Sequence, residues 1–282
     1  VMILVLLPMA QVSAVRINEV LDAPISLHEG KMTEAPEQGT VEFRDVSFRY
    51  PSSSGDVLEH VSFRANKGET VAFIGATGLA ARFYDATEGQ VLIDGQDVRS
   101  YSFDALYDRI GYVTQRAIVF AGDVRSNVLF GESGAPQDDE SVQRALSLAQ
   151  ATEFVDKLPG KLDAPIAQAG ANVSGGQKQR LSIARALARK PEILIFDDSF
   201  SALDYRTDAS LRAGLARELS DTTCLIVAQR IGTIRHADRI VVLDEGRVAG
   251  IGTHDELMKN CGVYREIAMS QLSAAELEKE GV

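Results

Sequence analysis

Two adjacent carboxylates, Asp197 and Asp198, directly follow the apolar run Ile-Leu-Ile-Phe at 193–196. A continuous apolar run predicts a strand that is buried on both faces, as in a parallel sheet. Open α/β sheets bind ligands at the carboxyl ends of their strands. An aspartate there can hold Mg²⁺, directly or through water, beside a phosphate. The alternative is that these residues cap the next segment, and the run by itself favours neither interpretation.

A serine and two glycines, Ser174, Gly175 and Gly176, stand at the start of a helical pattern. The glycines expose backbone N–H groups and a helix N-terminus carries partial positive charge, so this loop can cradle a phosphate. A serine N-cap with a glycine turn is the common structural alternative. The complete string "NVSGGQKQRLSIARAL", placed ahead of the two aspartates, favours the phosphate site.

A third stretch opens like the phosphate-binding loop G-x-x-x-x-G-K-[ST] and then departs from it. Its opening residues are Gly75, Ala76, Thr77 and Gly78. The pattern next requires glycine, lysine and a hydroxyl residue, where this chain has Ala80, Ala81 and Arg82. The loop therefore lacks the lysine that would reach the phosphates and the hydroxyl that would bind Mg²⁺.

The composition is that of an ordinary globular protein, with 45% hydrophobic and 24% charged residues in 282. The formal net charge is −11, and an acidic chain would be repelled by nucleic-acid phosphates, so we expect no nucleic-acid partner. The two cysteines, Cys224 and Cys261, have no metal-type spacing and are too few for a disulfide framework. They favour a reducing, cytosolic setting.

The first ten residues, "VMILVLLPMA", are almost entirely apolar. They are too few to span a bilayer, which requires ~20 apolar residues, and they lack the basic region of a signal peptide. A buried helix, a partner-binding segment or the end of a transmembrane helix would each explain them. A start at Val1 rather than at methionine favours a chain that is entered partway through a longer one.

The remaining patterns predict an α/β domain with a β-rich region at its front. A helix is expected to run out of the apolar segment, and the polar stretch 29–40 is a predicted linker. Alternating strands follow from Val41 onward. After about residue 100, helical patterns alternate with strands such as "TTCLIVAQ" and "RIVVLDEG", and a frayed tail is expected at the end.

These motifs, in this order, resemble the nucleotide-binding domain of an ATP-binding cassette (ABC) transporter of the exporter type, over residues 41–272. Tyr50 resembles the aromatic residue that stacks on adenine, and residues 75–78 resemble the opening of the Walker A loop. Gln115 is similar to the Q-loop glutamine, which touches Mg²⁺ and faces the membrane domain. The remaining matches are the signature motif with Ser174, Gly175, Gly176 and Gln177, Walker B with Asp197, the D-loop with Asp204, and the switch position with Gln229.

The resemblance implies a P-loop NTPase-like ABC ATPase core with a β-rich N-terminal subdomain and an α-helical signature subdomain. Residues 1–28 would be the end of the last transmembrane helix and a connecting helix, 29–40 a linker, 41–272 the cassette and 273–282 a tail. The implied ligands are ATP and Mg²⁺. The implied partners are a second cassette, arranged head to tail, and the coupling helices of a transmembrane domain, at the cytoplasmic face of a bacterial membrane. ATP closes such a pair and hydrolysis reopens it, which drives export.

Two substitutions depart from active members of that family. Asp198 stands where they carry the glutamate that positions the attacking water, and Gln229 stands where they carry the switch histidine. Glutamine can donate a hydrogen bond but cannot carry a proton or a positive charge. The four histidines, expected to be ordinary surface or packing residues, offer no substitute: His28, His60, His236 and His254. Asp198 and Gln229 together resemble the degenerate-site subunit of heterodimeric exporters, with weak hydrolysis at this chain's own site.

The Walker A region is also shorter than the pattern by ~8 residues between "GATG" and "RFYD". The absent piece would contain the lysine, the hydroxyl residue and about two helical turns. Since every other ATP motif is kept, we expect the protein to carry residues here that this sequence lacks. Two other functions stay open: a non-hydrolytic, ATP-binding regulatory cassette, and a soluble ABC ATPase of DNA repair or translation. The acidic charge and the apolar N-terminus disfavour the second.

Overall fold

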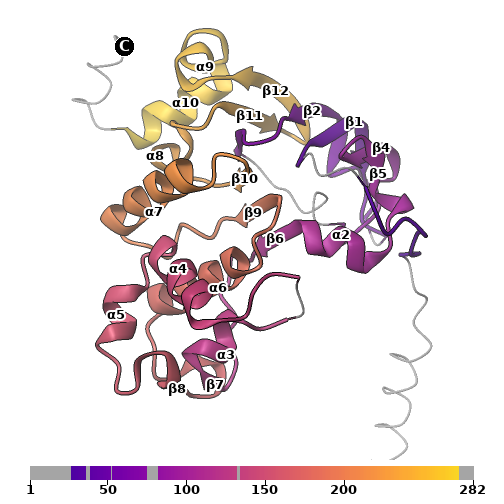
Figure 1. Cartoon of the computed structure of the whole chain (residues 1–282). Coiled ribbons are helices and arrows are strands. Elements are labelled where there is room, and N and C mark those ends of the chain that lie inside the picture. Colours follow the sequence, from indigo (N-terminus) through magenta and orange to yellow (C-terminus); the bar gives the residue numbers. More distant parts are fainter. Residues whose placement is uncertain (1–26, 36–38, 52, 75–81, 132–133, 273–282) are drawn as a thin grey trace, which may run out of the picture.

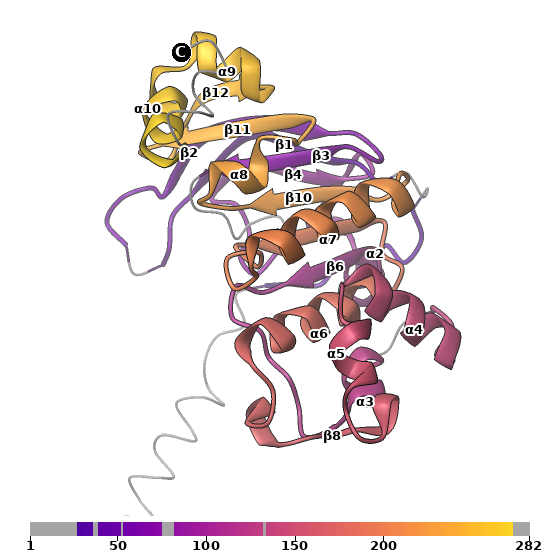
Figure 2. The ribbon, with the colours of Figure 1, turned by 90° about the vertical axis from the view of Figure 1, so that its left-hand side faces the viewer.

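The computed structural model describes residues 27–35, 39–51, 53–74, 82–131 and 134–272 (Figure 1). Its two principal sheets face each other, and helices cover the outer side of the larger one (Figures 1 and 2). The smaller sheet has the strand order β2-β1-β4-β5 and the larger has the order β12-β11-β3-β10-β9-β6. The expected helix before the linker and the expected tail lie outside the described residues.

The smaller sheet is the predicted β-rich region. Its strands are β1 (Val41–Phe48), β2 (Leu58–Ala65), β4 (Glu88–Ile93) and β5 (Gln96–Asp97), all paired antiparallel. Apolar and polar side chains alternate along most of β2, and the apolar ones are buried in the core between the two sheets. The rings of Phe43 and Phe63 stack with centroids 4.5 Å apart in the core between the two sheets.

The larger sheet contains five parallel strands and one antiparallel edge strand. The parallel strands are β3 (Thr70–Ile74), β6 (Ile110–Val113), β9 (Ile193–Asp197), β10 (Thr223–Val227) and β11 (Arg239–Asp244). The apolar runs of β9 and β10 are buried, as predicted for strands covered on both faces. The edge strand β12 (Arg247–Gly252) forms a hairpin with β11 that the sequence analysis did not foresee.

The helices form two groups. One group makes a separate helical subdomain beside β6 and β9 (Figure 2): α3 (Val124–Val128), α4 (Asp139–Leu148), α5 (Thr152–Asp156) and α6 (Gly175–Ala188). The other group follows the later strands: α7 (Tyr205–Glu218), α8 (Ile231–Ile234), α9 (His254–Asn260) and α10 (Gly262–Gln271). Helix α2 (Phe103–Arg109) leads into β6. The expected α/β architecture, with β-rich and helical subdomains, is confirmed.

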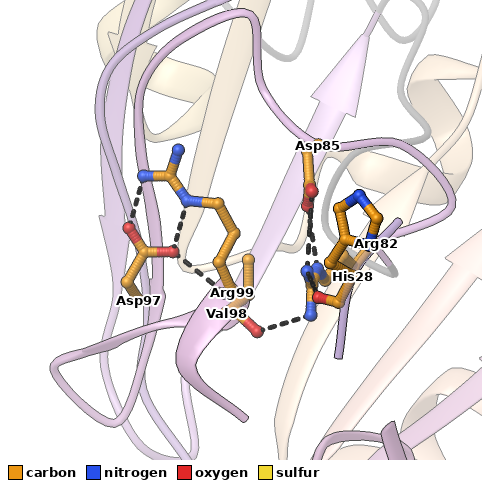
Figure 3. Close-up of polar contacts among 6 residues, drawn as sticks. All are labelled: His28, Arg82, Asp85, Asp97, Val98 and Arg99. Atoms are coloured by element: carbon orange, nitrogen blue, oxygen red, sulfur yellow. Dashed lines mark hydrogen bonds and ion pairs between the residues drawn. The ribbon is translucent and has the colours of Figure 1, made fainter. Parts of the chain in front are cut away.

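The connection from β3 to β4 contains no helix in its described residues, 82–87. Among these residues, the side chain of Arg82 is buried, with only 1% exposed. Its guanidinium donates to a carboxylate oxygen of Asp85 at 2.8 Å, to the carbonyl of Val98 at 3.0 Å and to the carbonyl of His28 at 2.9 Å (Figure 3). Arg82 therefore joins three stretches of chain that are distant in sequence.

The described part of the predicted linker is bound to the domain rather than detached from it. The backbone N–H of Gly30 donates to the Tyr101 carbonyl at 2.9 Å, and Met32 forms a bridge with Tyr101. Arg109 also donates to the carbonyl of Ala35 at 2.8 Å. Among the described helices, none combines the length and the apolar character that a membrane crossing requires.

Candidate functional site

The two aspartates that the sequence analysis singled out lie where β9 ends. Asp197 is the last strand residue, and Asp198 turns the chain with φ of 44°, in the left-handed region that is costly for a residue with a Cβ. The Asp198 N–H donates to the Val227 carbonyl of β10 at 2.9 Å, and the Ser201 hydroxyl donates to the Asp198 carbonyl at 2.7 Å. These bonds fix the direction of the turn.

The neighbouring strand β6 and the residues that follow it supply one donor to each carboxylate. The hydroxyl of Tyr112 donates to Asp197 Oδ2 at 2.7 Å, and Gln115 Nε2 donates to Asp198 Oδ2 at 2.8 Å. Burial and the hydrogen bond to Asp197 both raise the pKa of Tyr112, so the phenol stays protonated and remains a donor. Gln115 and Asp197, the two residues expected to bind Mg²⁺, thus lie at one edge of the sheet, whereas Tyr112 was not singled out from the sequence.

The donors at this edge fit Mg²⁺ by their chemistry. Asp197 offers a carboxylate and Gln115 an amide oxygen, and both are the hard oxygen ligands that Mg²⁺ prefers. The described residues hold no cluster of three or more acidic, histidine or cysteine side chains that could bind a metal ion alone. Mg²⁺ in nucleotide sites is usually held by one or two carboxylates together with phosphates.

Gln229 lies at the same edge, two residues after β10, and is exposed. Its carbonyl accepts a hydrogen bond from Gln271 Nε2 at 2.8 Å, and the oxygen of the same Gln271 amide accepts from the Ile231 N–H at 2.9 Å. The end of α10 thus positions the backbone around Gln229. Two of the histidines have partners elsewhere, since His60 bonds to Asp45 and His254 bonds to Tyr264.

The predicted serine–glycine loop begins helix α6. Ser174 is the N-cap and forms a capping box with Gln177, so the serine has the structural role that was considered beside the phosphate site. A Cβ at Gly175 would meet no atom within 4 Å, whereas one at Gly176 would lie 3.4 Å from the Ala202 carbonyl oxygen. The backbone at Gly175 is therefore open to a ligand that approaches from outside the chain.

Helix α6 is also hydrogen-bonded to the segment after β6 that contains Gln115. Gln179 of α6 donates to the carbonyl of Thr114, next to Gln115, at 3.2 Å.

Asp204 caps α7 and accepts from the N–H of Thr207 at 3.0 Å and from its hydroxyl at 2.7 Å. These two bonds lower the pKa of Asp204, which keeps this carboxylate ionised.

Tyr50 lies at the margin of the smaller sheet with 42% of its surface exposed. Its ring meets Phe48 edge-on at 4.8 Å and Tyr84 edge-on at 5.3 Å, so the three aromatic rings form one cluster. Such a cluster can stack on a planar base. Residues 75–78, the expected start of the Walker A loop, lie outside the described residues.

An aromatic groove of about 370 Å³ lies beside β6, between the larger sheet and the helical subdomain. We define it by six apolar side chains: Phe83, Tyr107, Tyr112, Ile118, Phe120 and Phe130. Ile118 is 54% exposed and Phe130 is 50% exposed, although both are large and apolar. Clustered exposed apolar side chains of this kind mark surfaces that bind a partner.

The fold and these motifs define an ABC transporter ATP-binding domain of the exporter type. The family profile described as "ABC transporter" matches residues 58–201, just over half of the chain, so the chain belongs to that family. A solved bacterial Atm1-family ABC exporter with ATP bound superposes with a TM-score of 0.84 and 31% identity. That match covers 95% of this chain and 48% of the exporter chain.

Curated relatives give the same assignment. An uncharacterised ABC transporter ATP-binding protein of Mycobacterium tuberculosis is 41% identical over 97% of this chain and 49% of the relative. An ATP-dependent lipid A-core flippase of Xanthomonas oryzae is 39% identical over 90% of this chain and 44% of the relative. The chain therefore spans about half the length of the relatives it matches.

Proposed function

We propose that this chain is the cassette of a bacterial membrane exporter, that it binds ATP with Mg²⁺, and that it works in a pair with a second cassette. The observation that carries the proposal is the edge of the larger sheet, where Gln115 reaches Asp198 and both lie beside Asp197 and Gln229. Asp197 and Gln115 would hold Mg²⁺, which supplies charge neutralisation at the phosphates when it is bound. Tyr50 would stack on the adenine.

The residues at this edge support a role for this chain as the degenerate half of a heterodimer, the subunit whose own ATP site hydrolyses slowly. Asp198 is one methylene shorter than glutamate, and Gln115 engages its carboxylate at 2.8 Å. Gln229 cannot carry the positive charge of a histidine. The serine–glycine loop, by contrast, keeps its open backbone at Gly175. This chain would thus complete the partner's competent site with its signature residues, Ser174 to Gln177, and with Asp204, while hydrolysing slowly at its own.

The aromatic groove would receive a coupling helix of the transmembrane domain. The relatives are about twice as long as the aligned region, which leaves room for such a domain in the same protein. An amphipathic helix lays its apolar face into a groove of this kind. Residues 1–28 would then lead from the last transmembrane helix, 29–40 would connect it to the cassette at 41–272, and 273–282 would be a tail. The cassette would lie at the cytoplasmic face.

The alignments support a missing piece in the phosphate loop. The match to an uncharacterised ABC transporter ATP-binding protein of Mycobacterium tuberculosis spans 288 positions, whereas 97% of the 282 residues here is about 274. The relative therefore has residues that this sequence lacks, which is compatible with the shortfall in the Walker A region. We therefore propose that the protein carries the Walker A lysine between Gly78 and Leu79.

A tryptic digest tests that proposal directly. Cleavage after Lys67 and Arg82 releases "GETVAFIGATGLAAR" if the chain is continuous as written. We expect no peptide of this mass, and a heavier region that is cut at an additional lysine. Detection of the short peptide would leave the chain without a phosphate loop and restrict its role to the signature residues.

The Asp198→Asn variant tests the hydrolytic role in the full-length heterodimer. Slower phosphate release, with unchanged release for Asp221→Asn on an exposed loop, would support hydrolysis at this chain's own site. Unchanged release together with ATP-driven closure would support the non-hydrolytic regulatory cassette instead. Recovery of the full-length protein only in the soluble fraction would contradict an exporter and favour a soluble ABC ATPase.

A further inference from the structure

The side chain of Tyr112 contributes both to the aromatic groove and to the site at the end of β9. Its ring meets the ring of Phe83 edge-on, with centroids 4.9 Å apart, inside the aromatic groove. Its hydroxyl donates to Asp197 Oδ2 at 2.7 Å, at the proposed nucleotide site. One rigid side chain therefore forms a wall of the groove and holds a carboxylate of the site.

The sheet register explains why this single side chain reaches so far. Tyr112 pairs with Ile195 in the parallel ladder between β6 and β9, two residues before Asp197. The phenol ring extends along the sheet by about the length of those two residues, ~6.6 Å for a strand. A phenylalanine would fill the same space but would leave Asp197 without its donor.

We propose that Tyr112 is a positioning residue that makes the orientation of the Asp197 carboxylate depend on occupancy of the aromatic groove. The proposal rests on the function proposed above, because it takes Asp197 as a ligand of Mg²⁺. A tyrosine side chain has only two rotatable bonds that place its ring, so a displacement of the ring displaces the hydroxyl as well. Hydrogen bonds to metal-binding carboxylates orient them, and loss of such a partner typically weakens metal binding 10–100-fold.

Phe83 is the contact through which the groove would act on Tyr112. It is 48% exposed, and it lies in the described part of the β3–β4 connection, next to the buried Arg82. A helix that enters the groove must press on Phe83 or on Tyr112 itself, since both line the groove. Tyr107 lines the same groove but stacks on Phe103, with centroids 5.8 Å apart, and it provides a matched control.

The test measures Mn²⁺, used as a probe for Mg²⁺, bound to the full-length transporter with its partner in the presence of ATP. Electron paramagnetic resonance reports free Mn²⁺ without any turnover. We expect Tyr112→Phe to weaken Mn²⁺ binding about tenfold. Tyr107→Phe should leave it unchanged, and Phe83→Ala should weaken it by a smaller factor. In the double variant, the effect of Phe83→Ala should disappear, because Phe83 acts through the hydroxyl of Tyr112.

The outcomes separate this inference from the proposed function. Wild-type affinity in Tyr112→Phe, or equal losses in Tyr107→Phe, would overturn the role of Tyr112 while leaving ATP and Mg²⁺ binding intact. Additive effects of Phe83→Ala and Tyr112→Phe would overturn the link to the groove. No Mn²⁺ binding by the wild-type protein would overturn the proposed metal site and the inference with it. A purely packing role would lower the unfolding free energy of Tyr112→Phe without changing Mn²⁺ affinity.

Discussion

Gln115 Nε2 lies 2.8 Å from Asp198 Oδ2, so the amide that follows β6 holds the carboxylate that follows β9. In this arrangement the Asp198 carboxylate is directed at the protein. A carboxylate that serves as a general base must instead lie within hydrogen-bond reach of the water it activates. The contact therefore offers a physical reason for the slow hydrolysis that we propose at this site.

Replacement of Asp198 by glutamate should raise ATP turnover. The additional methylene changes the reach of the carboxylate by about 1 Å, and a misplacement of that size can cost ~10²-fold in rate. We expect phosphate release by the reconstituted heterodimer to rise at least tenfold when the partner's own site is inactivated. Asp221→Glu, on an exposed loop, is the control. Equal rates in Asp198→Glu and wild type would show that reach is not what limits this site.

Replacement of Arg82 by lysine should destabilise the domain. The guanidinium is buried and satisfies Asp85 and two carbonyls, whereas lysine cannot make three bonds in these directions. The cost of leaving buried partners unpaired is about 2–4 kcal/mol. Arg99→Lys is the matched control, since Arg99 pairs with Asp97 on the surface and should contribute about 0–1 kcal/mol (Figure 3). Urea unfolding measures the stability of both variants. Equal losses in unfolding free energy would contradict a stabilising role for the buried Arg82 guanidinium.

Replacement of Gly175 by alanine should leave folding intact but impair pairing with the second cassette. A Cβ at Gly175 meets nothing within 4 Å, so the isolated chain tolerates it. The same methyl group would occupy the surface that the proposal assigns to the partner's ATP. We expect ATP-driven association to weaken about tenfold, a loss of about 1.4 kcal/mol. Gly232→Ala, equally open but placed in α8, should associate as wild type in analytical ultracentrifugation; weakening in both would point to a general defect.

Mild acid should destabilise the fold through His236. Burial, followed by the charges of Arg235, Arg212 and His254, lowers the pKa of His236 below its usual 6.5. The folded state thus binds this proton less readily than the unfolded state does. The contribution of the neutral His236 to the free energy of unfolding is fully present above pH 6.5 and is lost as the pH falls through the lowered pKa. Urea midpoints should fall less between pH 7.5 and 5.5 in His236→Gln than in wild type; parallel curves would exclude this histidine.

Part of the fold followed directly from the sequence. The runs at β9 and β10 were predicted because strands buried on both faces are continuously apolar, and α6 was predicted because its glycine start and helical spacing are both local signals. Gln115 and Asp198 were singled out separately from the sequence, and they meet because adjacent parallel strands end at one edge. These features depend only on short stretches of chain and on one topological rule.

The remaining features depend on contacts between distant residues. The buried anchor of Arg82 uses the carbonyls of His28 and Val98, which carry no side-chain signal in the sequence. Tyr112 looks like an ordinary aromatic strand residue until the register places its hydroxyl at Asp197. The antiparallel strand β12 is short and contains two glycines, a composition that also suits a loop. The contacts of Arg82, the role of Tyr112 and the pairing of β12 all depend on tertiary structure, which no local sequence pattern encodes.

The three bonds of Arg82 also have a mechanical meaning. One of its acceptors, the His28 carbonyl, belongs to the stretch through which any upstream chain must pull on the domain. Tension applied there is delivered through the guanidinium to the residue that begins the described chain after β3, and also to Val98, which directly follows β5 of the smaller sheet. Force from the upstream side thus reaches Arg82, 54 positions after His28 in the sequence, through a single hydrogen bond.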